Sequence, residues 1–184
     1  MKKELKPMKE VLYIVVHCSA TRASRKWTVE DIDRCHKAKN WAMIGYHWVI
    51  YQDGSIHQGR DEKYAGAHVR HYNEHAIGVC YIGGINDKGR NDDTRTPEQK
   101  AALWFLLEDL KRSYPKAKII GHRDFPNVHK DCPCFDCQSE YESLNRYSQT
   151  PIHEPRDGWW AIPCSIIIND YFFGSLLAYS YLCR

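Results

Sequence analysis

The sequence of 184 residues predicts an α/β fold in which helices flank a mixed central β-sheet. Three observations indicate this class. Short apolar runs rich in β-branched residues recur along the chain, as expected of buried strands. Two amphipathic stretches with helix-capping residues lie between these runs. An Asp-Gly pair between two strand-like segments indicates a hairpin, and therefore an antiparallel pair in an otherwise alternating pattern.

The strands are predicted from apolar runs and from one turn. Buried strands are expected at residues 11–16, 77–82 and 118–120. Residues 47–51 and 55–59 flank Asp53-Gly54, and such a pair between strand-like runs is the strongest short hairpin signal. Residues 61–76 carry glycine, histidine and charge without a clear period, so we expect a functional loop there.

Two helices are predicted from N-cap residues followed by apolar positions at helical spacing. Thr28 caps the first, with Asp31 three residues on completing a capping box, and this helix is expected to reach Trp41. Its inward positions are Val29, Ile32, Cys35, His36 and Lys39. Thr96 caps the second, with Gln99 completing a capping box, and this helix should end near Ser113. Its inward positions are Ala102, Leu103, Leu106, Leu107 and Leu110.

Composition divides the chain into three parts. Residues 1–10 are a charged N-terminal extension, and residues 11–146 are one domain of ordinary size that ends in a helix near residue 144. Residues 147–184 form a proline-containing linker and an apolar C-terminal extension of unknown role. We expect residues 158–183 to pack on the domain as a strand or helix, because Asn169-Asp170 leaves an apolar run too short to span a membrane.

Charge and cysteine usage limit the partners and the compartment. The net charge of +3 is spread without a long basic run, which argues against a nucleic-acid-binding protein. Cys18, Cys35 and Cys80 lie within apolar or amphipathic elements and are predicted to be buried thiols. The apolar stretch after the charged N-terminus is too short for a signal-peptide core, so we expect synthesis in a reducing compartment.

Three residues far apart in the sequence predict a metal site. His17 and His122 directly follow apolar β-branched runs, so each should lie at the end of a buried strand, where a ligand is held rigidly. Cys132 adds a thiolate. Structural zinc sites normally have four protein ligands, whereas catalytic sites have three and leave a position for water. The count therefore predicts one catalytic Zn²⁺ and a hydrolytic reaction.

Two further residues are predicted to be catalytic. Lys130 lies two residues before Cys132, and Tyr46 opens the strand-like run at residues 47–51. Hydrolysis of an amide by a zinc-activated water requires groups that stabilise an oxyanion and transfer protons. His47 should face away from Tyr46 along the strand and is predicted to be structural, and we assign no chemistry to His36 and His57.

These residues belong to motifs that resemble a known family. The chain is similar to the zinc-dependent N-acetylmuramoyl-L-alanine amidases of type 2, which include the amidase lysozymes of T-odd phages and the peptidoglycan recognition proteins. The match lies in residues 15–21, 45–47, 53–54, 59–61, 65–68, 77–79, 83–84, 121–122 and 130–136. It runs in order through most of the predicted domain and is highly specific.

The resemblance implies a substrate, a reaction and a setting. It implies a hydrolase with the amidase fold that cleaves the amide bond between N-acetylmuramic acid and L-alanine in bacterial peptidoglycan. It also implies a phage or prophage endolysin, made in the bacterial cytoplasm and released onto the cell wall, and we expect a monomer. His68 falls in the stretch that shapes the substrate cleft of the family, so the resemblance implies either a substrate contact or a place beside a ligand for it. Asn73 lies in the same loop with the same two roles open, and a plain loop residue is the alternative for both.

Four alternatives stay open at this point. A peptidoglycan-binding module without catalysis is the main functional one. A closed structural zinc site is another, with the ligands His129, Cys132, Cys134 and Cys137. A glycosidase would use two carboxylates, but nothing places Glu30, Asp31 and Asp61 across a cleft. Membrane contact of the C-terminal extension through Trp159 and Trp160 is disfavoured by the short apolar run.

Overall fold

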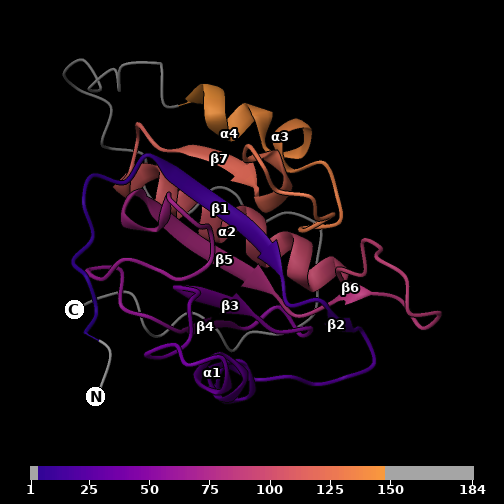
Figure 1. Cartoon of the computed structure of the whole chain (residues 1–184). Coiled ribbons are helices and arrows are strands. Elements are labelled where there is room, and N and C mark those ends of the chain that lie inside the picture. The colour runs from indigo at the N-terminus through magenta and orange to yellow at the C-terminus, as the bar shows by residue number, and fades with distance from the viewer. Residues whose placement is uncertain (1–3, 148–184) are drawn as a thin grey trace, which may run out of the picture. The chain divides into compact units, whose positions relative to one another are not determined.

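The computed structural model of the chain describes residues 4–147, and its centre is a five-stranded sheet in the order β4-β3-β5-β1-β7 (Figure 1). The strands are β1 (Tyr13–Cys18), β3 (Trp48–Ile50), β4 (Ile56–Gln58), β5 (Ala76–Tyr81) and β7 (Lys118–Gly121). Strand β1 pairs in parallel with β5 and β7, and β3 pairs in parallel with β5. Strand β4 is antiparallel to β3, so the predicted mixed sheet and its hairpin are confirmed.

A second, two-stranded sheet extends from the ends of β1 and β5. It consists of β2 (Thr21–Arg22) and β6 (Gly84–Ile85), which are parallel. Short 3₁₀ turns precede β5 (η1, Asn73–His75) and follow β7 (η2, His122–Asp124). The predicted loop at residues 61–76 is otherwise irregular, and the chain leaves both central strands at the same edge of the sheet.

Helix α1 (Val29–Ala38) has the capping box predicted at Thr28 but ends three residues before Trp41. The helix stops because Asn40 adopts a left-handed conformation with φ 62°. Ile32 and His36 are buried, whereas Cys35 is exposed, so the predicted burial of this thiol is wrong. The helix buries only a narrow stripe centred between Ile32 and His36, and Cys35 lies about 80° away from it around the axis.

Helix α2 (Pro97–Ser113) covers one face of the sheet and supplies much of the core (Figure 1). All five inward positions predicted for it are buried, and they pack with apolar side chains of β1, β5 and β7. Instead of one C-terminal helix there are two short ones beside β7, α3 (Cys137–Glu140) and α4 (Glu142–Tyr147). The break comes at Tyr141, whose side chain is fully buried against Phe135 and Trp104.

The predicted N-terminal extension meets the loop that follows β4. Pro7 forms an antiparallel bridge with Tyr64, and the backbone of Met8 donates to the carbonyl of Lys63. Within residues 4–147 no helix is long and apolar enough to cross a membrane. The predicted C-terminal linker and apolar extension lie, from residue 148 on, outside the described residues.

Candidate metal centre and active site

The sheet brings the two predicted histidine ligands together. Because β1 and β7 are parallel, their carboxyl ends meet at one edge, and their register pairs Val16 with Gly121. His17 and His122 follow these two residues directly, and their ring centroids are 4.6 Å apart. His17 is only 1% exposed, whereas His122 is half-buried. The two imidazoles therefore share one site at the end of the sheet.

Cys132 reaches the same site from the segment that follows η2. Its Sγ lies 3.7 Å from Nδ1 of His17. The ligand atoms of His17, His122 and Cys132 all lie within 4.8 Å of one another, and this is the one such group of histidine, cysteine and acidic side chains in residues 4–147. Two imidazoles and one thiol thus converge where the sequence predicted a metal site, in an arrangement that can hold a metal ion.

Backbone contacts hold Cys132 in place. The amide of Cys18 donates to the Cys132 sulfur over 3.3 Å, and the Cys132 carbonyl accepts from the amide of Arg123 over 2.8 Å. The hydroxyl of Tyr81, at the end of β5, donates to the carbonyl of Pro133 over 2.7 Å. Hydrogen bonds to a thiolate ligand fix its direction. None of these partners was predicted, because a backbone amide leaves no signal in sequence.

A buried arginine secures the segment beyond Cys132. The Arg95 guanidinium lies over the ring of Phe135 at 3.3 Å from its centroid, in cation–π geometry. It also forms ion pairs at 2.8 Å with Asp93 and with Glu140, the last residue of α3. The Arg95 side chain is 1% exposed, and the paired carboxylates raise its pKa despite burial. Arg95 therefore links α3 and Phe135 to the segment that precedes α2.

The alternative zinc site made only of residues 129–137 is not formed. The sulfur of Cys134 lies 3.7 Å from that of Cys18 and contacts the carbonyl of Gly84. Cys137 is buried in the hydrophobic core, and His129 is exposed. Cys134 adopts φ 71°, which turns its side chain toward Cys18 rather than toward Cys132. The four candidate ligands therefore do not converge.

The electrostatic surroundings keep both histidines neutral. Burial lowers the pKa of His17 well below its usual value, and the nearby His68 and His122 lower it further. Burial and the charge of Lys130 lower the pKa of His122 to about 4. A neutral imidazole offers a lone pair to a metal, whereas a protonated one does not. The site is therefore ready to bind a cation at neutral pH.

Tyr46 lies beside the histidine pair. Its ring centroid is 5.1 Å from that of His17. Burial raises its pKa well above the usual value, and neighbouring thiols such as Cys80 add to the effect, so the phenol stays protonated and can donate. The preceding Gly45 is required, since a Cβ there would lie 2.2 Å from the carbonyl oxygen of Ala67. This close approach between two loops sets where Tyr46 enters the site.

Lys130 and His47 have different surroundings. Lys130 is exposed, and its positive charge lowers the pKa of both His17 and His122. His47 is fully buried. Its Nδ1 accepts from the amide of Gly78 over 2.8 Å, and its Nε2 lies 3.0 Å from the carbonyl of Tyr64. His47 thus fastens β3 to β5 and to the following loop.

The loop residues His68 and Asn73 lie close to the site but differ in position. Nδ1 of His68 lies 3.0 Å from Nε2 of His17. Oδ1 of Asn73 accepts from the amides of His68 and Val69 over 2.8 and 2.9 Å. Asn73 therefore braces the loop, and His68 contacts a candidate ligand. The substrate contacts expected of both residues stay predictions.

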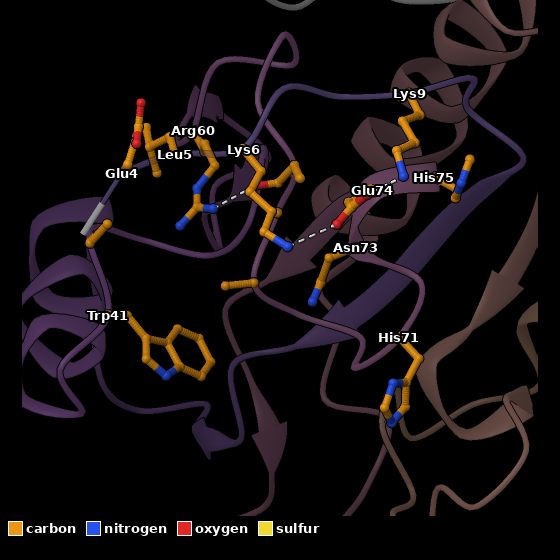
Figure 2. Close-up of a pocket in the computed structure, with 14 residues that line it drawn as sticks. Glu4, Leu5, Lys6, Lys9, Trp41, Arg60, His71, Asn73, Glu74 and His75 are labelled. Carbon is orange, nitrogen blue, oxygen red and sulfur yellow. Dashed lines mark hydrogen bonds and ion pairs between the residues drawn. The ribbon is translucent and has the colours of Figure 1, made fainter.

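Two of the hollows on the described surface have similar volumes. One, of about 600 Å³, includes Tyr46 and is lined by residues 19–22 and by α1. The other, of about 570 Å³, contains none of the five predicted ligand and catalytic residues (Figure 2). Figure 2 shows Lys6 and Lys9 both reaching Glu74 in it, at 3.2 and 2.5 Å. The hollow that includes Tyr46 is therefore the one that adjoins the candidate active site.

Comparison with known proteins now bears on this geometry. The family model described as N-acetylmuramoyl-L-alanine amidase (Amidase_2) matches residues 7–135. The chain belongs to this family. A search of characterised proteins finds the endolysin of Enterobacteria phage K11, 43% identical over 129 residues, which covers 70% of this chain and 84% of that protein.

Solved structures of family members share the fold. N-acetylmuramoyl-L-alanine amidase LysC from Clostridium intestinale is 29% identical with a TM-score of 0.66, and the match covers 78% of this chain and 91% of that one. Drosophila PGRP-LB is 25% identical with a TM-score of 0.61, covering 78% and 86%. The predicted family, fold class and enzyme class are therefore confirmed, and the chain is an amidase that acts on peptidoglycan.

Proposed function

We propose that this amidase is zinc-dependent, with His17, His122 and Cys132 as the ligands, and that it cleaves the bond between N-acetylmuramic acid and L-alanine in the manner of a phage endolysin. The observation that carries the proposal is the convergence of these three ligand atoms within 4.8 Å at the end of the sheet. Three protein ligands leave a fourth position for water or substrate, as in catalytic zinc sites.

The donor set fits zinc. Ideal tetrahedral geometry with ordinary zinc–nitrogen and zinc–sulfur bonds separates neighbouring ligand atoms by roughly 3.4 to 3.6 Å. The distance of 3.7 Å between Cys132 Sγ and His17 Nδ1 is close to this value. Neutral imidazoles and a sulfur ligand also favour zinc over magnesium or calcium, which prefer oxygen ligands.

Two other side chains complete the proposed chemistry. Zinc bound there would lower the pKa of a water molecule and polarise the substrate carbonyl. Lys130 would place its positive charge beside the oxyanion that develops when the carbonyl carbon is attacked. Tyr46, held protonated by burial, would donate a hydrogen bond to that oxyanion or pass its proton to the leaving amine of L-alanine. Lys130 would act from the 129–135 segment, and Tyr46 from the loop before β3.

The proposed setting follows from the relatives and from the chain itself. The endolysins of phages K11 and T7 are 43% and 42% identical to this chain, which supports synthesis in a bacterial host and action on the cell wall after release. All five proposed site residues come from one chain, which supports a monomer. We propose peptidoglycan rather than a nucleic acid as the partner, because the basic residues of the chain are scattered without a long run. Membrane contact by residues 158–183 is the less favoured alternative, because their apolar run is too short to span a membrane.

One preparation tests the proposal. Zinc content is measured on the purified protein, together with the release of free amines from peptidoglycan with and without a chelator. We expect one zinc per chain, chelator-sensitive release of L-alanine amino groups and no new reducing sugar ends. Zinc without cleavage would favour the alternative, a non-catalytic peptidoglycan-binding module. New reducing ends would instead indicate a glycosidase and contradict the proposal.

A further inference from the structure

We propose that His68 is a positioning residue that fixes the tautomer and the orientation of His17, so that Nδ1 of His17 faces Cys132 and the metal position. His68 would contact neither the metal nor the reacting atoms. Its role would be to hold a ligand. The inference rests on the proposed metal site, and it decides between the two roles that the family resemblance left open for His68, which are support of a ligand and contact with the substrate.

The chain of hydrogen bonds starts at a backbone carbonyl. Nε2 of His68 lies 3.2 Å from the carbonyl oxygen of Ala76, at the start of β5. A carbonyl oxygen can only accept, so Nε2 of His68 must carry the hydrogen. A neutral imidazole has a single N–H group, and its other nitrogen is an acceptor. Nδ1 of His68 is therefore an acceptor.

The same reasoning applies to His17. Nδ1 of His68 lies 3.0 Å from Nε2 of His17. Since the His68 nitrogen accepts, Nε2 of His17 must donate, which leaves the lone pair of His17 on Nδ1. That nitrogen lies 3.7 Å from the sulfur of Cys132. The Ala76 carbonyl thus determines, through two imidazole rings, which nitrogen of His17 is free for the metal.

The ring of His68 is held in a narrow space. A Cβ on Gly66 would lie 2.3 Å from its Cδ2, and a Cβ on Gly78 would lie 2.7 Å from the same atom. Neither position tolerates a side chain while the ring stays in place. The amides of His68 and Val69 are also tied to Asn73. The loop therefore fixes the direction of the His68 ring, as a partner that orients a metal ligand requires.

Zinc affinity tests this role through a matched pair of variants. His68→Leu removes the acceptor, whereas His68→Asn places its amide oxygen where Nδ1 lies and keeps it. Loss of an outer partner of a metal ligand typically weakens zinc binding about 10- to 100-fold. We expect that loss for His68→Leu by chelator competition, and a change within about threefold for His68→Asn. Equal zinc affinity of wild type and His68→Leu would overturn the proposal, as would equal losses in both variants.

Nitrogen NMR of the metal-free wild-type protein provides a test that needs no variant to fold. We expect the hydrogen of His17 on Nε2 and a scalar coupling across the hydrogen bond to Nδ1 of His68. A hydrogen on Nδ1 of His17 would overturn the proposal. If wild type binds no zinc, the proposed zinc site fails, whereas the tautomer measurement still decides whether His68 positions His17.

Discussion

The site has two halves that are built differently. His17 and His122 lie at the ends of parallel strands, and His17 is enclosed by β-structure and by the His68 ring. Lys130 and Cys132 lie on an irregular segment, with Lys130 exposed and Cys132 half-buried. The sheet half takes its geometry from strand register. The segment half takes it from individual contacts with distant residues, including the Cys18 amide, the Tyr81 hydroxyl and Arg95.

The difference separates two ways of placing a ligand. Hydrogen bonds between paired strands fix the backbone position of each residue. Both histidines are held in this way, because they follow neighbouring strands. An irregular segment has no such register, so the loss of any one contact that holds it can displace the site residues that it carries. We therefore expect changes in the segment half to affect metal binding or turnover, and changes around the sheet half to affect its protonation and orientation.

Replacing the segment ligand should have the largest effect. Cys132→Ser should weaken zinc binding by more than the roughly 100-fold that loss of an outer partner can cause, and should abolish wall lysis. Chelator competition and turbidity of a cell-wall suspension measure the two effects. Cys134→Ser is the matched control, because that sulfur faces Cys18, and it should leave zinc affinity unchanged. Full lysis by Cys132→Ser would show that the sheet half alone holds the metal.

Lys130→Ala should lower turnover while zinc stays bound. Removal of one oxyanion-stabilising group typically costs about 100- to 1,000-fold in turnover. The rate of amine release from peptidoglycan at steady state measures turnover, and the zinc content of the same preparation shows whether zinc stays bound. Lys116→Ala, at an exposed lysine 3.6 Å from Glu10, controls for the loss of a surface charge. An unchanged rate in Lys130→Ala would exclude the oxyanion role and leave the segment half with the metal ligand alone.

Arg95→Met should destabilise the fold and loosen the segment half. Removing one partner of a buried ion pair leaves the other charges uncompensated and costs about 3 kcal/mol, at the lower end of the usual range because Asp93 and Glu140 are partly exposed. Urea unfolding measures the change. Arg112→Met removes an exposed helix pair and should cost less than about 0.5 kcal/mol. Equal stabilities of the two variants would contradict the anchoring role of Arg95.

Low pH should destabilise the fold around the sheet half because His36 becomes protonated. Its Nδ1 accepts from the amide of Gly45 over 3.0 Å, and burial lowers its pKa from 6.5 to about 4, with Lys39 and Arg60 adding to the effect and Asp33 opposing it. The unfolded chain therefore binds more protons between these two pH values. Stability contributed by neutral His36 is fully present above pH 6.5 and is lost as the pH falls toward 4, by about 3 kcal/mol.

Unfolding of the metal-free protein across this pH range measures the effect. His17 and His122 also titrate below their usual values, so wild type alone does not isolate His36. His36→Gln should flatten the profile while the contribution of the two ligand histidines persists. A profile identical to that of wild type would show that His36 adds nothing to the pH dependence.

Much of the fold was predictable because its signals are local. Both capping boxes and the Asp-Gly hairpin formed as predicted, and the inward face of α2 is buried in full. Failures came where a distant contact overrides the local pattern. Cys35 has the spacing of a buried residue but lies outside the narrow stripe that α1 buries. The expected C-terminal helix is broken where the Tyr141 side chain turns into the core.

By itself the sequence determined the kinds of ligand and the strands that carry two of them, because residue type and hydrophobic period are properties of the chain. It left open whether Cys132 lies with the two histidines or closes a site with His129, Cys134 and Cys137, and it gave no sign of the hydrogen bonds from Ala76 through His68 to His17. Only tertiary structure decided these points. The physical reason is that side-chain direction in an irregular segment, and the tautomer of a buried imidazole, are set by partners far away in the chain.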